Sequence, residues 1–147
     1  WQSMVTHGHA RSQTCCAFYC LWARYLLNNE SDAWEHAASD IRGFVKGTAF
    51  EAELEFQIRP DDFVSGSGSG YVVDSLRSAR WVMKEPAYEG VVKAAVALGN
   101  DTDTTACIAG GVAGIRDGVE AIPHRWLDAL RGREIAEPLL ERLLNRL

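Results

Sequence analysis

Apolar residues recur at helical spacing along almost the whole chain of 147 residues. No stretch of four or more residues alternates between apolar and polar side chains as a half-buried strand would. A first helix is expected between Ser12 and Asn28, with one apolar stripe spaced i, i+4, i+7 and i+11. The members of this stripe are Cys16, Cys20, Ala23 and Leu27. The pattern predicts an all-α fold with no sheet.

Capping patterns mark the starts of two further helices. Asp32 with Glu35, and Thr48 with Glu51, both have the spacing of a capping box. The apolar face of the first of these helices consists of Trp34, Ala37, Ala38, Ile41, Phe44 and Val45. The second is shorter, carries Phe50, Leu54 and Ile58, and is expected to stop at Pro60.

Glycine and proline divide the rest of the chain into five more predicted helices. These are expected from near Tyr71, after Pro86, from near Asp103 and after Pro123, followed by a leucine-rich last helix. The leucines of that last helix are Leu139, Leu140, Leu143, Leu144 and Leu147. About eight helices with short connections indicate a compact multi-helix bundle that forms a single all-α unit over residues 1–147.

Composition and charge exclude several classes of protein. The chain is 47% hydrophobic and 24% charged, an ordinary globular mixture that excludes a disordered chain. Its formal net charge of −5 argues against a nucleic-acid partner. The apolar runs are too short for a membrane span, and the first residues show no secretory signal. The four cysteines have no framework spacing, so we expect free thiols in a reducing compartment, the cytoplasm.

The most informative local motif is Asp101-Thr102-Asp103-Thr104, where a loop is expected to enter a helix. Carboxylate and hydroxyl oxygens are the hard ligands that Mg²⁺ or Mn²⁺ prefers, and a cation would relieve the repulsion between two close carboxylates. The alternative is structural, because Asp and Thr are favoured helix caps and acids suit the first turn. The local sequence leaves both interpretations open.

Two other metal-loop motifs do not fit these residues. An EF-hand loop that began at Asp101 would need Gly and Glu where the chain has Ala106 and Val112. The Asp-x-Asp-x-Thr loop of haloacid-dehalogenase-like phosphatases should follow a buried strand and precede a large α/β domain. Only a short helical sequence remains after Thr105, so the phosphatase loop does not fit this chain.

A glycine-serine segment and a group of cysteines also need an interpretation. Residues 65–70 read Ser-Gly-Ser-Gly-Ser-Gly, which by itself is typical of a flexible linker. Three cysteines, Cys15, Cys16 and Cys20, crowd one predicted helix. For these we favour buried packing over metal binding.

Four segments of the chain resemble the ADP-ribosylglycohydrolases, the family of the dinitrogenase-reductase-activating glycohydrolase. The resemblance lies in residues 6–13, 69–81, 99–114 and 120–126, which include Thr-His-Gly-His, Ser-Gly-Tyr-Val-Val-Asp-Ser-Leu, Gly-Asn-Asp-Thr-Asp-Thr-Thr-Ala and Glu-Ala-Ile-Pro. The segments follow the order of the family and span nearly the whole chain.

The resemblance implies an all-α, Mg²⁺-dependent hydrolase that releases ADP-ribose from a modified side chain or small acceptor. Two Mg²⁺ ions, or Mn²⁺ in their place, would orient a ribose and the attacking water. By resemblance, the metal ligands are Asp101, Asp103 and Thr104, of which Asp101 and Asp103 are also catalytic. The substrate-binding residues it implies are His7, Gly68, Ser69, Gly70 and Tyr71.

The resemblance covers only the C-terminal half of a family enzyme. In the family the N-terminal half supplies an acidic residue and a Thr-Asp-Asp-type motif that complete the metal site, and the chain has no Thr-Asp-Asp. The pair Asp61-Asp62 lies at the wrong place in the family order to substitute for it. We therefore expect a homo-oligomer or pairing with a missing N-terminal half. The alternative function is a catalytically incomplete module that binds ADP-ribose or oligomerises.

Overall fold

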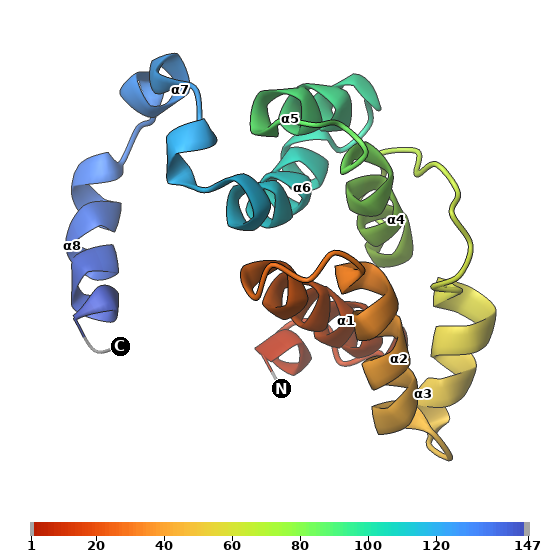
Figure 1. Cartoon of the computed structure of the whole chain (residues 1–147). Helices are drawn as coiled ribbons and strands as arrows, with labels where there is room; N and C mark the ends of the chain where they lie inside the picture. The colour runs from red at the N-terminus through yellow and green to blue at the C-terminus, as the bar shows by residue number, and fades with distance from the viewer. Residues whose placement is uncertain (1, 146–147) are drawn as a thin grey trace.

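The computed structural model describes residues 2–145, which form helices and no strand (Figure 1). This confirms the all-α prediction. The helices are α1 (Ala10–Leu27), α2 (Ala33–Val45), α3 (Ala49–Ala52), α4 (Val72–Val82), α5 (Tyr88–Ala97), α6 (Thr102–Asp117), α7 (His124–Ala129) and α8 (Arg133–Leu144). Two 3₁₀ segments, η1 (Gln2–Val5) and η3 (Val119–Ala121), and one π-helical segment, η2 (Glu53–Ile58), complete the list. None of the described helices has the length and apolar character needed to cross a membrane.

Helix α1 lies at the centre of the molecule and packs against α2, η2, α4 and α6. Its buried face consists of Thr14, Cys15, Phe18 and Trp22. The predicted stripe is wrong, because Cys16, Cys20 and Leu27 are exposed and Ala23 is only half-buried. Apolar residues lie on most sides of this helix, so spacing alone does not define one face. The side with the two large aromatic rings buries the most apolar surface, and that side faces the core.

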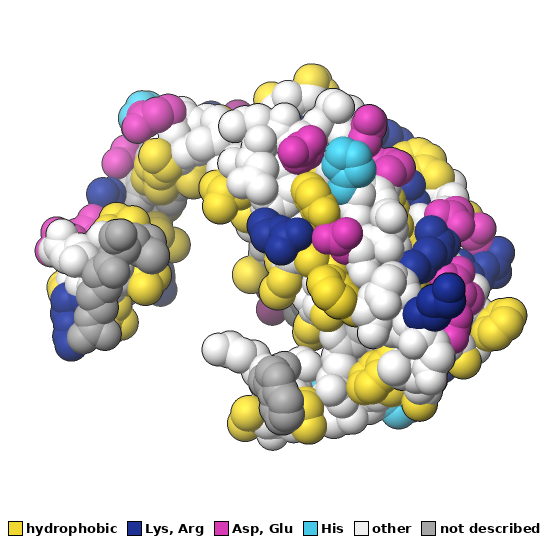
Figure 2. Space-filling model, turned by 60° about the horizontal axis from the view of Figure 1, so that its bottom comes forward, with side chains coloured by type: hydrophobic (Ala, Val, Ile, Leu, Met, Phe, Trp, Pro, Cys, Tyr) yellow, Lys and Arg dark blue, Asp and Glu magenta, His cyan; other side chains and the backbone are white. Residues whose placement is uncertain are grey.

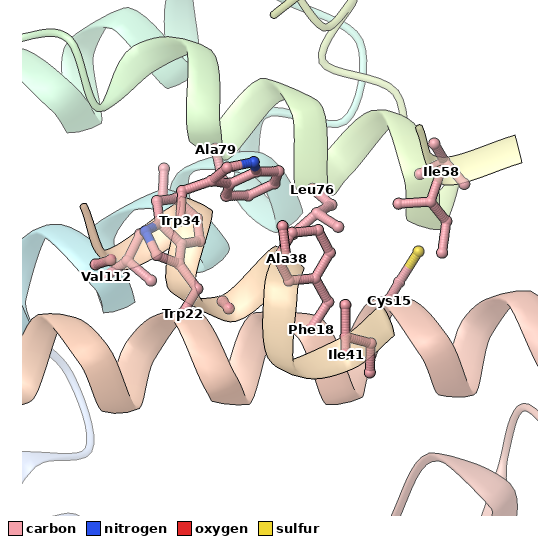
Figure 3. Close-up of a cluster of buried hydrophobic side chains, with 14 of the residues drawn as sticks. Cys15, Phe18, Trp22, Trp34, Ala38, Ile41, Ile58, Leu76, Ala79 and Val112 are labelled. Carbon is pink, nitrogen blue, oxygen red and sulfur yellow. The ribbon is translucent and has the colours of Figure 1, made fainter. Parts of the chain in front are cut away.

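Three aromatic rings from α1 and α2 form the centre of the core (Figure 3). The ring of Trp34 lies 4.4 Å from that of Phe18 and 5.0 Å from that of Trp22, measured between centroids. Its indole N–H donates to the carbonyl of Pro60 at 2.9 Å, so the one polar atom of this buried ring is satisfied. Trp34 therefore fixes the chain at the point where η2 ends and the long loop to α4 begins.

The predicted caps of α2 and α3 differ in outcome. Helix α2 begins directly after Asp32, but the Asp32 side chain makes no capping hydrogen bond. Thr48 caps α3 by accepting from the N–H of Phe50, and Glu51 accepts from the N–H of Gly47 at 2.8 Å. The predicted apolar face of α2 is buried except for Phe44, which is 69% exposed.

Helices α5 and α6 form a closely packed pair beside α4 (Figure 1). Glycines of α6 allow this close contact, since a Cβ added at Gly110 would lie 3.4–3.5 Å from Tyr88 and Val92 of α5, and one at Gly114 would lie 3.7 Å from Tyr88. The phenol of Tyr19 on α1 donates to the carbonyl of Ile108 at 2.9 Å and so links α1 to α6.

Helix α8 stands apart from the rest of the molecule (Figures 1 and 2). None of its residues is buried, and its exposed leucines are Leu139, Leu140, Leu143 and Leu144. Leu147, the last leucine of the predicted helix, lies outside the described residues. This amphipathic helix leaves its apolar side uncovered within the described part of the chain.

Candidate functional site

One carboxylate of α4, that of Asp74, holds the glycine-serine loop of residues 65–70. Asp74 accepts hydrogen bonds from the backbone N–H and the hydroxyl of both Ser67 and Ser69, over 2.7–2.9 Å. Burial works to raise the pKa of Asp74, but the hydrogen bonds from the two serines outweigh burial and lower it. The loop therefore has a defined structure and is not a flexible linker.

Gly68 connects this loop to the start of α6. Its carbonyl accepts from the N–H of Asp101 at 2.9 Å and from the hydroxyl of Thr105 at 3.3 Å, and its own N–H donates to Ser78. Its φ of 74° lies in the left-handed region, and an added Cβ would lie 2.8 Å from that of Leu98. Because of both constraints, only glycine fits this position.

The two carboxylates of the Asp-x-Asp motif lie at the N-terminus of α6. Asp101 is the N-cap, and its Oδ1 accepts from the N–H of Thr104 at 3.4 Å. The pKa of Asp103 is lowered by the Asp101 carboxyl group, which can donate to Asp103 while it still carries its own proton, and then by the backbone N–H groups of Asp103 and Thr104. The two carboxylates are thus neighbours at the positive end of the helix dipole.

The second oxygen of Asp101 faces the glycine-serine loop. A Cβ added at Gly70 would collide with Asp101 Oδ2. Capping therefore uses one oxygen of Asp101, and the other lies against the last residue of the loop. The structure brings the predicted metal-ligating segment and the predicted substrate-binding loop into direct contact.

Tyr71 comes directly after this contact point and is the N-cap residue of α4. It is 51% exposed, so it is not a core aromatic. Its hydroxyl accepts a hydrogen bond of 2.5 Å from Nη1 of Arg11, and Nε of Arg11 donates to Glu53 at 2.6 Å.

The substrate-binding role of His7 stays a prediction. His7 is exposed before α1, and its Nδ1 lies 2.9 Å from the hydroxyl of Thr6. No hydrogen bond within residues 2–145 joins it to Asp101, Asp103 or the loop. The neighbouring His9 has a structural role, since it caps α1 by accepting from the N–H of Arg11.

The described residues offer only part of a metal site. Among residues 2–145, no three His, Cys, Asp or Glu side chains gather closely enough to hold a metal ion.

All four cysteines are free, and only Cys15 is buried, with its pKa raised by burial to about 12. Buried packing is thus confirmed for Cys15 and is wrong for Cys16 and Cys20.

Several residues that build the site were not predicted from the sequence. The loop is held by Asp74, Ser78 and Thr105, but the sequence shows of these residues only that they lie on predicted helices. A small hydroxyl residue in the middle of an apolar helix face, such as Ser78, is a usable signal for a tertiary hydrogen bond. No local signal connects Arg11 with Tyr71, which lie 60 positions apart.

These features agree with the comparison of the sequence with known protein families. A profile of the ADP-ribosylglycohydrolase family matches residues 2–147. The chain therefore belongs to the ADP-ribosylglycohydrolase family. No solved structure matches the chain.

Relatives with curated names include two ADP-ribosylarginine hydrolases. The chain is 32% identical over 143 residues to the ADP-ribosylarginine hydrolase Tri1 of Serratia proteamaculans (strain 568), which covers 97% of the chain and 38% of that protein. It is 28% identical over 146 residues to the ADP-ribosylarginine hydrolase Tri1 of Pseudomonas putida (strain GB-1), and this alignment covers 99% of the chain and 38% of that protein. The identity to the ADP-ribosyl-[dinitrogen reductase] glycohydrolase of Rhodospirillum rubrum is 25% over 131 residues. That alignment covers 88% of the chain and 41% of that protein. The chain thus spans about two-fifths of the length of these relatives.

The hydrogen bonds to Asp74 predict a specific pH dependence of stability. Asp74→Asn should lower the free energy of unfolding at pH 7 by about 2 kcal/mol, because charged hydrogen bonds to the two serines are lost. The folded-state pKa of Asp74 is lowered, so this contribution is present above the unfolded pKa of about 3.9. It is lost as the pH falls through the folded-state value, and the difference between wild type and variant should shrink there.

Urea unfolding at pH 7, 4 and 3 measures this difference. The matched control is Asp128→Asn, which changes an exposed aspartate and should alter stability by less than about 0.5 kcal/mol at each pH. A difference for Asp74→Asn that stays constant from pH 7 to pH 3 would contradict the role given to its charge.

Proposed function

We propose that this chain carries part of the active site of an enzyme that hydrolyses the glycosidic bond between ADP-ribose and a modified side chain or small acceptor. The observation that supports this most directly is the contact between Gly70 and Asp101 Oδ2. It joins the loop expected to receive the substrate to the carboxylates expected to act on it. Membership of the ADP-ribosylglycohydrolase family supports the same reaction.

Asp101, Asp103 and the hydroxyl of Thr104 would hold Mg²⁺, or Mn²⁺, in this proposal. The donor set suits such ions, since it consists of hard oxygens and places two carboxylates side by side. A divalent ion, when bound, supplies a site that orients and activates water. Because the described residues lack a third acidic ligand, the remaining ligands of a two-metal site would come from groups outside them.

The loop of residues 68–71 would bind the substrate beside these carboxylates. The N–H groups of Gly68 and Ser69 already donate to Ser78 and Asp74, so they fix the loop in place. Contact with the substrate would then fall to the outer side of the loop, to Gly70 and to the exposed ring of Tyr71. Fixing these groups in advance avoids an ordering cost when the substrate binds.

The acceptor that we propose to test first is ADP-ribosylarginine. Two of the relatives are named ADP-ribosylarginine hydrolases, and each is matched along nearly the whole of this chain. The four free cysteines are consistent with a reducing compartment such as the cytoplasm.

The second candidate function is a module that binds ADP-ribose without turnover. It is favoured by the incomplete set of metal ligands among the described residues. The two functions differ in one measurable property, which is release of free ADP-ribose in the presence of Mg²⁺.

We also propose that the chain associates with a second copy of itself or with the remaining part of a longer enzyme. The exposed leucines of α8, together with Phe44 and Phe56 at 69% and 75% exposure, support this association. Figure 2 shows hydrophobic side chains on both sides of the opening between α8 and the rest of the molecule. Exposed apolar surface of this extent is typical of an interface.

Mg²⁺ should stabilise the protein against thermal unfolding, and ADP-ribose should increase the effect. At 100 times its Kd a ligand adds about 2.7 kcal/mol to the stability of the native state, which calorimetry detects easily. Asp103→Asn should abolish the response to Mg²⁺ while the metal-free protein keeps its fold, because Asp103 is exposed. The absence of any response at millimolar Mg²⁺ would refute a usable metal site in this chain.

Gly70→Ala should weaken Mg²⁺ binding because the substitution displaces the Asp101 carboxylate and no other proposed ligand. The new methyl group would collide with Asp101 Oδ2, and the flexible carboxylate would move away at little cost to stability. We expect at least a roughly tenfold loss of Mg²⁺ affinity, as for the loss of one well-placed ligand contact. Gly8→Ala is the control, since a Cβ there meets no atom within 4 Å. Equal Mg²⁺ affinities of the two variants would argue against this geometry.

Association should depend on the leucines of α8. Light scattering after size-exclusion chromatography should give a mass above 16.2 kDa that decreases on dilution. Replacing Leu139 and Leu143 together by Glu should shift the protein toward the monomer, because charges would enter the interface. Glu134→Gln on the same helix is the control. A monomer at tens of micromolar wild-type protein would show that α8 does not mediate self-association.

A further inference from the structure

Among residues 2–145, the one specific side-chain contact of Tyr71 is made by its hydroxyl group. Half of the residue is exposed, and the chain at this point turns from the loop into α4. The preceding residue, Gly70, touches the Asp101 carboxylate. Tyr71 is thus joined directly to the residue that lies against Asp101, and its exposed ring forms part of the surface of this loop.

The anchor is the guanidinium group of Arg11, near the start of α1. Its Nη1 donates to the Tyr71 hydroxyl at 2.5 Å, and its Nε donates to Glu53 Oε2 at 2.6 Å. The side chains of Arg11 and Glu53 are 25% and 20% exposed, so their ion pair is partly shielded from water, whereas the bond to Tyr71 is exposed. The planar fork of an arginine fixes both partners in one geometry, which a lysine cannot do.

We infer that Arg11 is a positioning residue that holds the Tyr71 ring as one wall of the substrate site beside Asp101 and Asp103. Glu53 fixes the guanidinium and neutralises its charge, so Arg11 acts through the tyrosine and not as an anion-binding group. Three elements far apart in the sequence, α1, η2 and the start of α4, meet at this contact. The binding part of this inference rests on the proposed function, whereas the position of the ring does not.

A matched arginine on the same helix makes a comparable set of contacts away from the site. Arg24 forms an ion pair with Asp40 at 3.2 Å, and the Tyr25 hydroxyl donates to the same carboxylate at 2.7 Å. Arg24→Ala therefore removes an arginine from α1 and breaks an ion pair beside a tyrosine. It leaves Tyr71 and its surroundings unchanged.

The position of the ring is tested by NMR with ring-¹³C-labelled tyrosine. The chain contains four tyrosines, and Tyr71→Phe assigns the signal of Tyr71. We expect Arg11→Ala to shift this signal and to increase the mobility of the ring, while the signals of Tyr19, Tyr25 and Tyr88 stay in place. Arg24→Ala should affect Tyr25 and leave Tyr71 unchanged. An unchanged Tyr71 signal in Arg11→Ala would overturn the inference.

Binding of ADP-ribose in the presence of Mg²⁺ is then measured by calorimetry for a double-mutant cycle. Arg11→Ala and Tyr71→Phe should each weaken binding by about tenfold, the equivalent of one charged hydrogen bond. The double variant should be no weaker than either single one, because both changes remove the same anchor. Arg11→Lys should restore part of the affinity, and Arg24→Ala should lose none.

The results separate the inference from the proposed function. Additive losses in the cycle would mean that Arg11 only stabilises the fold, and wild-type affinity in Arg11→Ala would also overturn the inference. If the wild-type chain does not bind ADP-ribose, the proposed function fails for this chain. In that case the NMR signal of Tyr71 still decides whether Arg11 holds the ring.

Discussion

The carbonyl of Gly68 is the point on which the candidate site depends. It accepts from the N–H of Asp101 and the hydroxyl of Thr105, so it ties the glycine-serine loop to the first turn of α6. Asp74 holds the same loop from the side of α4. A buried backbone carbonyl that found no partner here would be costly, and these partners exist only when α4 and α6 pack in this arrangement.

This connection brings the proposed metal ligands and the proposed substrate-binding residues into one small region. The carboxylates at the start of α6 are suited to a hard divalent cation, and the loop presents Gly70 and Tyr71 beside them. Asp101 contributes to both, since one of its oxygens caps the helix and the other meets Gly70. The structural and the functional interpretation of this aspartate are therefore compatible, because a carboxylate has two oxygens to offer.

The fold outside the site falls into two parts with different degrees of burial. Around Trp34 the helices form a closely packed aromatic core, whereas α8 has no buried residue at all. The chain covers about two-fifths of the length of its curated relatives. An amphipathic helix gains its stability mainly from packing, so the uncovered leucines of α8 are consistent with a partner that covers them.

The sequence by itself determined the helices and marked the paired carboxylates of the Asp-x-Asp motif as candidate metal ligands. Helical spacing, glycine and proline located the eight α-helices found within residues 2–145, since these signals act within a few residues along the chain. The buried face of α1 was decided only in the tertiary structure, because Cys16 and Phe18 are both apolar and only the packing of α2 selects the ring. The same holds for residues 65–70, which have the sequence of a linker. In the structure they are held by Asp74 of α4 and by the hydrogen bond between Gly68 and Asp101. The contact between Arg11 and Tyr71 spans 60 positions, a separation at which only folding brings two side chains together.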